Sequence, residues 1–230
     1  PALRKAHADT ARTMLAVEAL ALQTLKAAAR HAPGDPVTVA GDVATRLAPA
    51  VLMVRKASRR KGAERFAVEL QTAGADVAIP QLRAPDDADR LAAERAARGY
   101  SDALLKQAQT WMREHDAAQR NPILQAEVSR LEMIAASEVA SAFNEERARL
   151  EYAIAEEQRG QWVLPVVKIW SAEMESATTC AVCRALNGET RLWGTSFSRQ
   201  REPGKVHPRC RCYTRYIAAP TYITRARKAA

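Results

Sequence analysis

The chain has 230 residues, enough for one large domain or two small ones, and it carries a formal net charge of +9. Hydrophobic residues make up 47% of it, but alanine inflates that share, and aromatic residues contribute only 5%. No apolar run approaches the ~20 residues of a membrane-spanning helix, and the first residues lack the apolar core of a signal peptide. The composition therefore argues against a membrane partner and predicts a protein made in the cytoplasm, where thiols stay reduced.

Long helices separated by breaks are predicted over the first 120 residues. Residues 1–32 carry an apolar stripe at helical spacing, and the break at 33–36 contains two prolines. A second helix is expected over 42–72, with Pro49 either kinking it or starting a new helix, and the second break covers 74–86. A third helix starts at the acidic cluster near residue 86, which suits the positive end of a helix dipole.

The polar residues of these helices are expected to face solvent. The basic run over 55–61 lies on the second predicted helix, where a solvated face is the usual interpretation. His7, His31 and His115 are isolated in the sequence, and we interpret them as surface residues. Because only three of the twelve aromatic residues precede residue 140, we expect a thin, alanine-rich helical assembly.

The fourth helix is the most clearly delimited, over 122–159. Asn121 suits its N-cap, Pro122 suits its first position, and apolar residues recur along one side. This helix is too long for a small globule to cover, so we expect part of it to pack on another chain. Glu138 and Asn144 are candidates for hydrogen bonds to the segment that follows.

After Gly160 the pattern becomes strand-like. The segments 162–170, 190–194 and 212–217 are rich in β-branched and aromatic residues, which favours strands. The predicted fold class is therefore α+β, with long alanine-rich helices followed by a small module that contains β-structure. The predicted organisation is a helical region over 1–160, the module over 161–218 and a basic tail over 219–230.

All four cysteines lie in one window of 33 residues. Cys180 and Cys183 form a CxxC pair, and His207, Cys210 and Cys212 follow after a gap. Zinc takes four thiolate or imidazole ligands in a tetrahedron, so five donors compete for four places. The alternatives are disulfides or free buried thiols, and a reducing cytoplasm disfavours disulfides unless the mature particle is extracellular. No catalytic zinc motif accompanies the donors, so we expect a structural Zn²⁺ and no catalytic residue.

The order of these residues resembles that of one protein family. The pattern reads W-x9-CxxC-x3-NG and then P-x3-HPxCRC, and SEVASAFNEER precedes it at 137–147. Over roughly residues 125–217 the chain resembles the C-terminal domain of tailed-phage minor head proteins, the Mu F-like head morphogenesis family. The resemblance implies a non-enzymatic minor capsid protein of the virion head, with several copies per particle. Such a protein would associate with the portal protein or the major capsid protein and with packaged double-stranded DNA, during head assembly, DNA packaging or delivery.

The last 32 residues are strongly basic, with nine lysines and arginines against one acid, which leaves +8. Concentrated positive charge is typical of proteins that bind nucleic acid through its phosphates without reading its sequence. For Arg209 and Arg211 the alternative is local neutralisation of a zinc-thiolate site, and for the tail it is a solvated segment. The competing functions are a zinc-dependent nucleic-acid-binding protein and a nuclease. The candidate DNA-binding residues are Arg199, Arg201, Lys205, Arg209, Arg211, Arg215, Arg225, Arg227 and Lys228.

Overall fold

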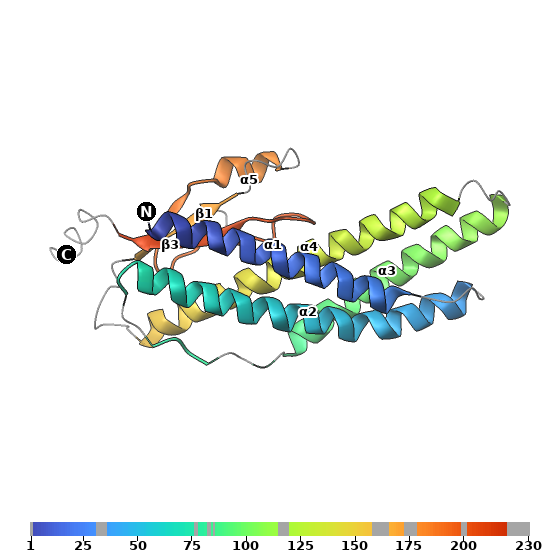
Figure 1. The fold of residues 1–230 in the computed structure, drawn as a ribbon, viewed down its shortest axis with the longest axis horizontal. Helices are drawn as coiled ribbons and strands as arrows, with labels where there is room; N and C mark the ends of the chain where they lie inside the picture. The colour runs from blue at the N-terminus through green and yellow to red at the C-terminus, as the bar shows by residue number, and fades with distance from the viewer. Residues whose placement is uncertain are drawn as a thin grey trace.

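The computed structural model describes residues 2–30, 36–75, 78–81, 84, 86–114, 120–157, 166–172, 179–198 and 202–219. It confirms the α+β class: long helices come first, and a small antiparallel sheet with a short helix follows (Figure 1). None of the described helices is long and apolar enough to cross a membrane. The elements are α1 (Ala2–Ala29), α2 (Pro36–Thr72), α3 (Asp87–Glu114), α4 (Arg120–Glu157), β1 (Val166–Ser171), α5 (Ala181–Leu186), β2 (Thr190–Leu192) and β3 (Tyr213–Ala218).

Local capping explains where the helices begin and end. Helix α2 has Pro36 at its first position, earlier than expected, and it continues as one helix past Pro49. Gly74 ends it as predicted, with a φ of +81°, while the amide of the next residue bonds back to the carbonyl of Leu70. Helix α3 begins with a reciprocal cap in which Asp86 and Asp89 each accept the other's backbone N–H.

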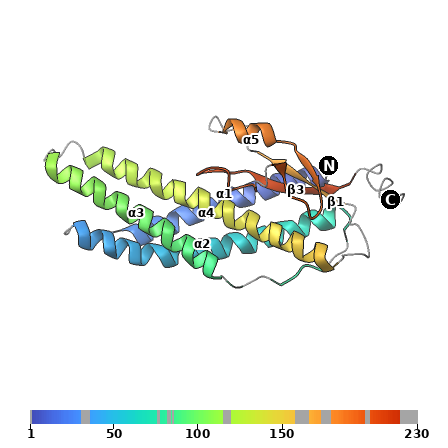
Figure 2. The ribbon, with the colours of Figure 1, turned by 180° about the vertical axis from the view of Figure 1, so that it is seen from behind.

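The four long helices lie side by side, and α2 contacts each of the other three (Figures 1 and 2). Their shared core combines small alanines, such as Ala93 and Ala97, with buried leucine and valine side chains. Helices α2 and α4 cross so closely that a Cβ on Gly62 would lie 2.5 Å from the carbonyl oxygen of Phe143. This core agrees with the expected alanine-rich assembly.

The sheet has the order β2-β1-β3, with both neighbouring pairs antiparallel. It packs directly on the helices, because Phe66 of α2 contacts Tyr216 of β3 edge-on and stacks on Trp193. Leu150 and Ile154 of α4 belong to the same buried cluster. The predicted boundary between the helical region and the module lies within 158–165, outside the described residues. This core packs the helices that come before the boundary against the sheet that follows it.

Side chains from the helices occupy the edge of β3 that faces away from β1. The Asn144 amide donates to the carbonyl of Cys212 at 3.0 Å and accepts the N–H of Thr214 at 3.2 Å. One turn further along α4, Arg147 donates to the carbonyl of Thr214 at 2.6 Å. The prediction that Asn144 bonds to the following module is confirmed.

Two further side chains continue this edge. Glu69 of α2 accepts the N–H of Tyr216 at 3.0 Å, and His7 of α1 donates to the carbonyl of Tyr216, with 3.3 Å between the two atoms. Glu69 also pairs with Arg147 at 2.7 Å, and both of these side chains are fully buried. We call Asn144, Arg147, Glu69 and His7 the edge clasp. The prediction that His7 lies on the surface is wrong, because the clasp buries it.

The basic run of α2 is not a solvated face throughout. Arg55 and Arg59 are buried, and both contact Asp89 of α3, at 2.7 and 2.9 Å. Arg55 also pairs with Glu138 and Glu145 of α4. The solvated-face prediction is therefore wrong for these two arginines, because α3 and α4 bring compensating carboxylates around them. Burial raises the pKa of Glu138, an effect that Arg55 offsets only in part.

The apolar side of α4 is covered within this chain from Leu131 to Ile154, where α1, α2 and β3 pack on it. Over this stretch the length of α4 does not require another chain, so the expectation that part of the helix packs on another chain concerns the rest of it. Val128, nearer the start of the helix, is 38% exposed.

Replacing Arg147 by methionine should lower the free energy of unfolding by about 3–5 kcal/mol, because it leaves the carboxylate of Glu69 buried and uncompensated. Urea unfolding followed by circular dichroism measures this. The matched control is Arg60→Met, which breaks the exposed Arg60–Glu64 ion pair on the surface of α2 and should change stability little. Equal effects of the two substitutions would show that the edge clasp contributes no more to the free energy of unfolding than an exposed ion pair does.

Candidate metal centre

The first two candidate ligands are placed by the start of α5. Cys180 is the N-cap of this helix, and its sulfur accepts the backbone N–H of Cys183 at 3.3 Å. A turn at Asn187-Gly188 ends the helix, and Gly188 has a φ of +84°. The Asn187 side chain accepts the N–H of Ala172 at 2.9 Å, which fastens the turn to the end of β1.

The other candidate ligands lie on a turn that is fastened to α4. The N–H of Cys210 bonds to the carbonyl of His207 at 3.1 Å, which closes a turn over Pro208 and Arg209. Arg209 has a φ of +60°, a conformation that usually favours glycine. Its backbone N–H donates to the Ser137 hydroxyl at 2.9 Å, and its guanidinium also bonds to α4. An arginine thus serves here as an anchor of the turn.

A glycine lets the preceding loop approach α4 closely. Gly204 has a φ of +83°, and a Cβ there would lie 2.6 Å from the carbonyl oxygen of Ala140. From this position the backbone amides of Gly204 and Val206 help to lower the pKa of the Cys210 thiol. The close approach therefore directs backbone donors at a candidate ligand.

The five predicted donors come together as two groups that share Cys183. One group is Cys180, Cys183 and His207, the other is Cys183, Cys210 and Cys212, and within each group the ligand atoms lie within 4.8 Å of one another. The sulfur of Cys183 is 3.8 Å from that of Cys210 and 3.3 Å from Nε2 of His207. With Zn–S bonds of about 2.3 Å, the edge of a tetrahedron is about 3.8 Å. The donor set and its spacing therefore fit a metal ion.

His207 has the tautomer that a ligand needs. Its Nδ1 lies 2.7 Å from the carbonyl oxygen of Pro208, so Nδ1 carries the proton and donates it. The lone pair of Nε2 then points to the sulfur of Cys183. A hydrogen bond of this kind orients metal-binding histidines in general.

The thiols do not share one protonation state. The Cys212 thiol and backbone amides lower the pKa of Cys210 to about 5. Burial raises the pKa of Cys183 to about 12, and the neighbouring Cys210 raises that of Cys212. Loss of the proton is thus favoured at Cys210, while burial and repulsion between neighbouring thiolates oppose it at Cys183 and Cys212. A bound cation would remove that repulsion and favour the thiolate form of all three.

Aromatic side chains surround this cluster. Trp170 and Phe197 are buried and meet edge-on, with their ring centroids 5.3 Å apart. They form one hydrophobic cluster with Cys183, Cys210 and Cys212. Both aromatic side chains are therefore part of the core of the module. All four cysteines are free thiols, so no disulfide joins them.

The described candidates for DNA binding make contacts within the chain. Lys205 pairs with Glu145 at 3.0 Å, Arg211 donates to Glu18 of α1 at 2.9 Å, and Arg209 bonds to Ser129 of α4. Arg215 is partly buried on β3 and lies close enough to His7 to help lower the pKa of that imidazole. The remaining candidates, Arg199, Arg201, Arg225, Arg227 and Lys228, lie outside the described residues.

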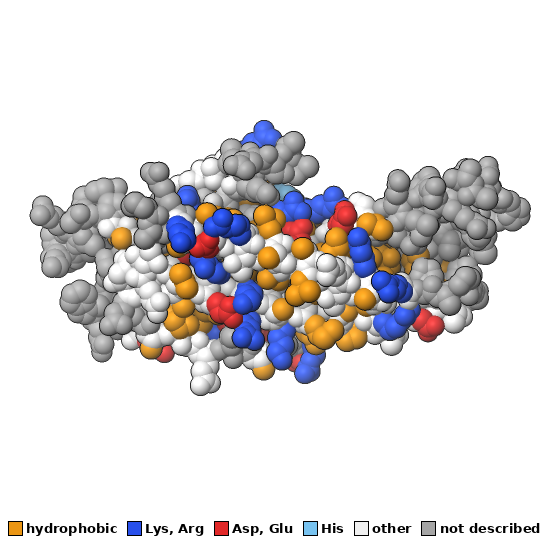
Figure 3. All heavy atoms as spheres, viewed as in Figure 1, with side chains coloured by type: hydrophobic (Ala, Val, Ile, Leu, Met, Phe, Trp, Pro, Cys, Tyr) orange, Lys and Arg blue, Asp and Glu red, His pale blue; other side chains and the backbone are white. Residues whose placement is uncertain are grey.

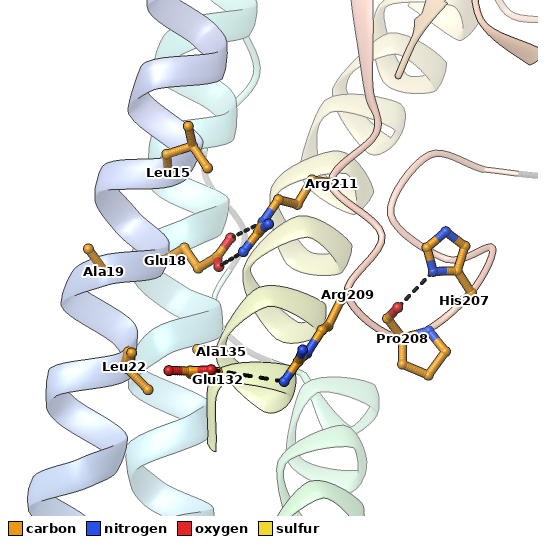
Figure 4. A pocket seen from close by; sticks show the side chains of 10 residues that line it. All are labelled: Leu15, Glu18, Ala19, Leu22, Glu132, Ala135, His207, Pro208, Arg209 and Arg211. Atoms are coloured by element: carbon orange, nitrogen blue, oxygen red, sulfur yellow. Dashed lines mark hydrogen bonds and ion pairs between the residues drawn. The ribbon is translucent and has the colours of Figure 1, made fainter. Parts of the chain in front are cut away.

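A groove of about 600 Å³ adjoins the metal cluster, between α1, α4 and the His207 turn (Figure 4). Leu15, Leu22 and Ala135 supply apolar walls. Its charged residues face one another as the pairs Arg211–Glu18 and Arg209–Glu132. Figure 3 likewise shows lysines and arginines scattered among apolar and acidic side chains over this face. Positive and negative side chains are therefore mixed on this face, and the groove has no excess of positive or negative charge.

Most of the edge clasp and the buried arginines are not identifiable from single residues of the sequence. A signal existed for one part of it, because Asn144 and Arg147 are three residues apart and so share a face of α4. Glu69 and His7 carry no local signal, since their partners are 147 and 209 residues away.

Comparisons of the chain with protein-family models, curated proteins and solved structures give no match. Arguments about function therefore rest on the residues and their geometry.

Alanine at Gly204 should loosen the turn that carries the ligands. Both Gly204 and Gly188 have a φ near +84°, but a Cβ on Gly188 meets no atom within 4 Å, whereas one on Gly204 meets the backbone of α4. Gly204→Ala should therefore destabilise the protein by about 2 kcal/mol more than Gly188→Ala, as overpacking does. Thermal unfolding of the two variants gives the difference, and equal losses would mean that the close approach does not matter.

Cys183 should be the ligand that cannot be replaced, because it belongs to both groups. Cys183→Ser is expected to abolish stoichiometric metal binding. Cys180→Ser and His207→Ala should each keep a weaker site, since both leave the group of Cys183, Cys210 and Cys212 complete. Titration with Co²⁺, followed by its thiolate charge-transfer absorption, compares the three variants. Undiminished binding by Cys183→Ser would refute the assignment.

Proposed function

We propose that the chain is a minor head protein of a tailed phage, in which a structural zinc ion fastens the cysteine module to the helical body. It would be made in the host cytoplasm and reside in the virion head, in several copies per particle. There it would associate with the portal protein or the major capsid protein and with packaged double-stranded DNA.

One observation carries this proposal: the two halves of the sequence pattern that resembles the family meet in space. Ser137, at the start of SEVASAFNEER, accepts the N–H of Arg209 in HPRCRC. Asn144, from the same segment, holds the carbonyl of Cys212 and the N–H of Thr214. The residue types that make up the pattern thus have a joint physical task, which is to hold the ligand-bearing turn on α4.

The surroundings of the site favour a structural metal over a catalytic one. A catalytic zinc ion needs an open position and a nearby general base. Here Cys183, Cys210 and Cys212 are buried against Trp170 and Phe197. Glu189, which follows Cys183 by six residues, is engaged with the N–H of Ser198 and with Arg191. Four thiols and one imidazole are also ligands that suit zinc.

The DNA contact in this proposal rests on the basic residues that the structure leaves undescribed, together with the net charge. Lys205, Arg209 and Arg211 already have acidic or polar partners in α1 and α4, so binding a phosphate would require breaking those contacts. A contact of this kind would be independent of DNA sequence and would weaken steeply with salt.

The test is co-expression of the chain with the portal and major capsid proteins encoded beside it, followed by capture, nuclease treatment and a high-salt wash. We expect one of the two proteins to remain bound and about one zinc ion per chain to be present. Asn144→Ala should loosen the module and reduce both readouts. The matched control is Ser101→Ala, which should reduce them less. A chain that elutes alone, and binds nucleic acid only, would favour the competing zinc-dependent nucleic-acid-binding protein.

A further inference from the structure

Helix α5 is held on the body of the protein mainly through the thiol cluster. Among its residues Cys183 alone is buried, and that side chain packs with Trp170, Phe197 and Cys210. Figures 1 and 2 draw α5 beyond the sheet and away from α2. Its C-terminal end is tied to β1 by the Asn187-Gly188 turn. The position of its N-terminal end therefore depends on what happens to the cysteines.

The sulfurs of Cys183 and Cys210 are poised for a covalent alternative to a metal. They lie 3.8 Å apart, and their side chains are 1% and 0% exposed. A disulfide bond is about 2.05 Å long, so closure requires an approach of less than about 2 Å. Cys180 is placed differently, because its sulfur accepts the N–H of Cys183 and is partly exposed. A bond between Cys183 and Cys210 would join α5 to the turn before β3, which is also what a shared metal ion would join.

We propose that Cys183 and Cys210 form a second, redox-dependent staple, which closes as a disulfide when the metal is lost under oxidising conditions and keeps α5 in place. In the step each thiol gives up one proton and one electron, a sulfur–sulfur bond forms, and one molecule of hydrogen peroxide takes up both protons and both electrons to become two molecules of water. A reducing cytoplasm favours the metal form, and an oxidising exterior favours the disulfide. The inference rests on the metal centre of the proposed function and not on the head-protein role, so a chain that fails to bind a portal can still pass the test below.

The experiment uses the full-length chain in three forms: loaded with Zn²⁺, metal-free and reduced, and metal-free after one equivalent of hydrogen peroxide. Digestion with trypsin under non-reducing conditions separates Cys210 from Cys212, because the chain is cleaved after Arg209 and Arg211. Cys180 and Cys183 stay together on the peptide 169–184, so the cysteine variants below distinguish them. We expect the peptide that ends at Arg184 to be linked to the Cys210-Arg211 dipeptide in the oxidised form alone. The link should persist in Cys180→Ser and disappear in Cys183→Ser.

Hydrogen exchange of the α5 amides supplies the structural readout. Protection should be similar in the zinc and disulfide forms and lower in the reduced, metal-free form. Linkage of Cys180 to Cys183, or any link through Cys212, would overturn the assignment of the pair. Equal oxidation of the zinc-loaded chain when it too is given one equivalent of hydrogen peroxide, or undiminished protection of α5 in the reduced metal-free chain, would overturn the idea of alternative staples.

Discussion

The free edge of β3 imposes the constraint on which the rest of the structure depends. A buried strand edge must find partners for its backbone N–H and C=O groups, because each unpaired group is costly away from water. No further strand supplies them among the described residues. Side chains from three helices do so instead, and at their centre is the fully buried pair of Arg147 and Glu69. The guanidinium lies over the rings of Phe143 and Tyr216, at 5.5 and 5.1 Å from their centroids.

This constraint also sets the site. Cys210 and Cys212 come directly before β3, so holding the strand at the level of Asn144 holds both sulfurs. The turn that contains His207 is fixed in addition by Ser137 through Arg209. What remains to be placed is α5 with Cys180 and Cys183, and a metal ion shared between the two groups would place it. Helix α4 thus positions β3, β3 positions Cys210 and Cys212, and the metal ion would position α5.

Much of the local structure could be predicted from the sequence, because its causes are local. The acidic start of α3, the stop at Gly74 and the turn at Asn187-Gly188 follow from the chemistry of caps and turns. The five donors could be identified for the same reason, since zinc ligands are few in kind and regular in spacing.

The remainder depends on contacts distant in the sequence. Arg55 and Arg59 belong to a basic run that reads as surface, and they are buried because Asp89, Glu138 and Glu145 arrive from other helices. His7 reads as an isolated surface residue, yet it meets a strand 209 residues away. Whether such charged or polar side chains are buried depends on partners that are distant in the sequence, and no local sequence pattern encodes those partners. Arg209 and Arg211 likewise contact α4 and α1, whereas their charge in the sequence suggests DNA binding or neutralisation of a zinc-thiolate site.

The central claim is that the edge clasp makes the helices and the sheet one cooperative unit. The most direct test is urea unfolding of the zinc-loaded chain followed at once by circular dichroism at 222 nm, which reports on the long helices, and by tryptophan fluorescence, to which Trp170 and Trp193 of the module contribute. The account predicts coincident transitions with a single midpoint. Two separate transitions, with the fluorescence change preceding the loss of helix, would show that the module is an independent unit and would contradict it.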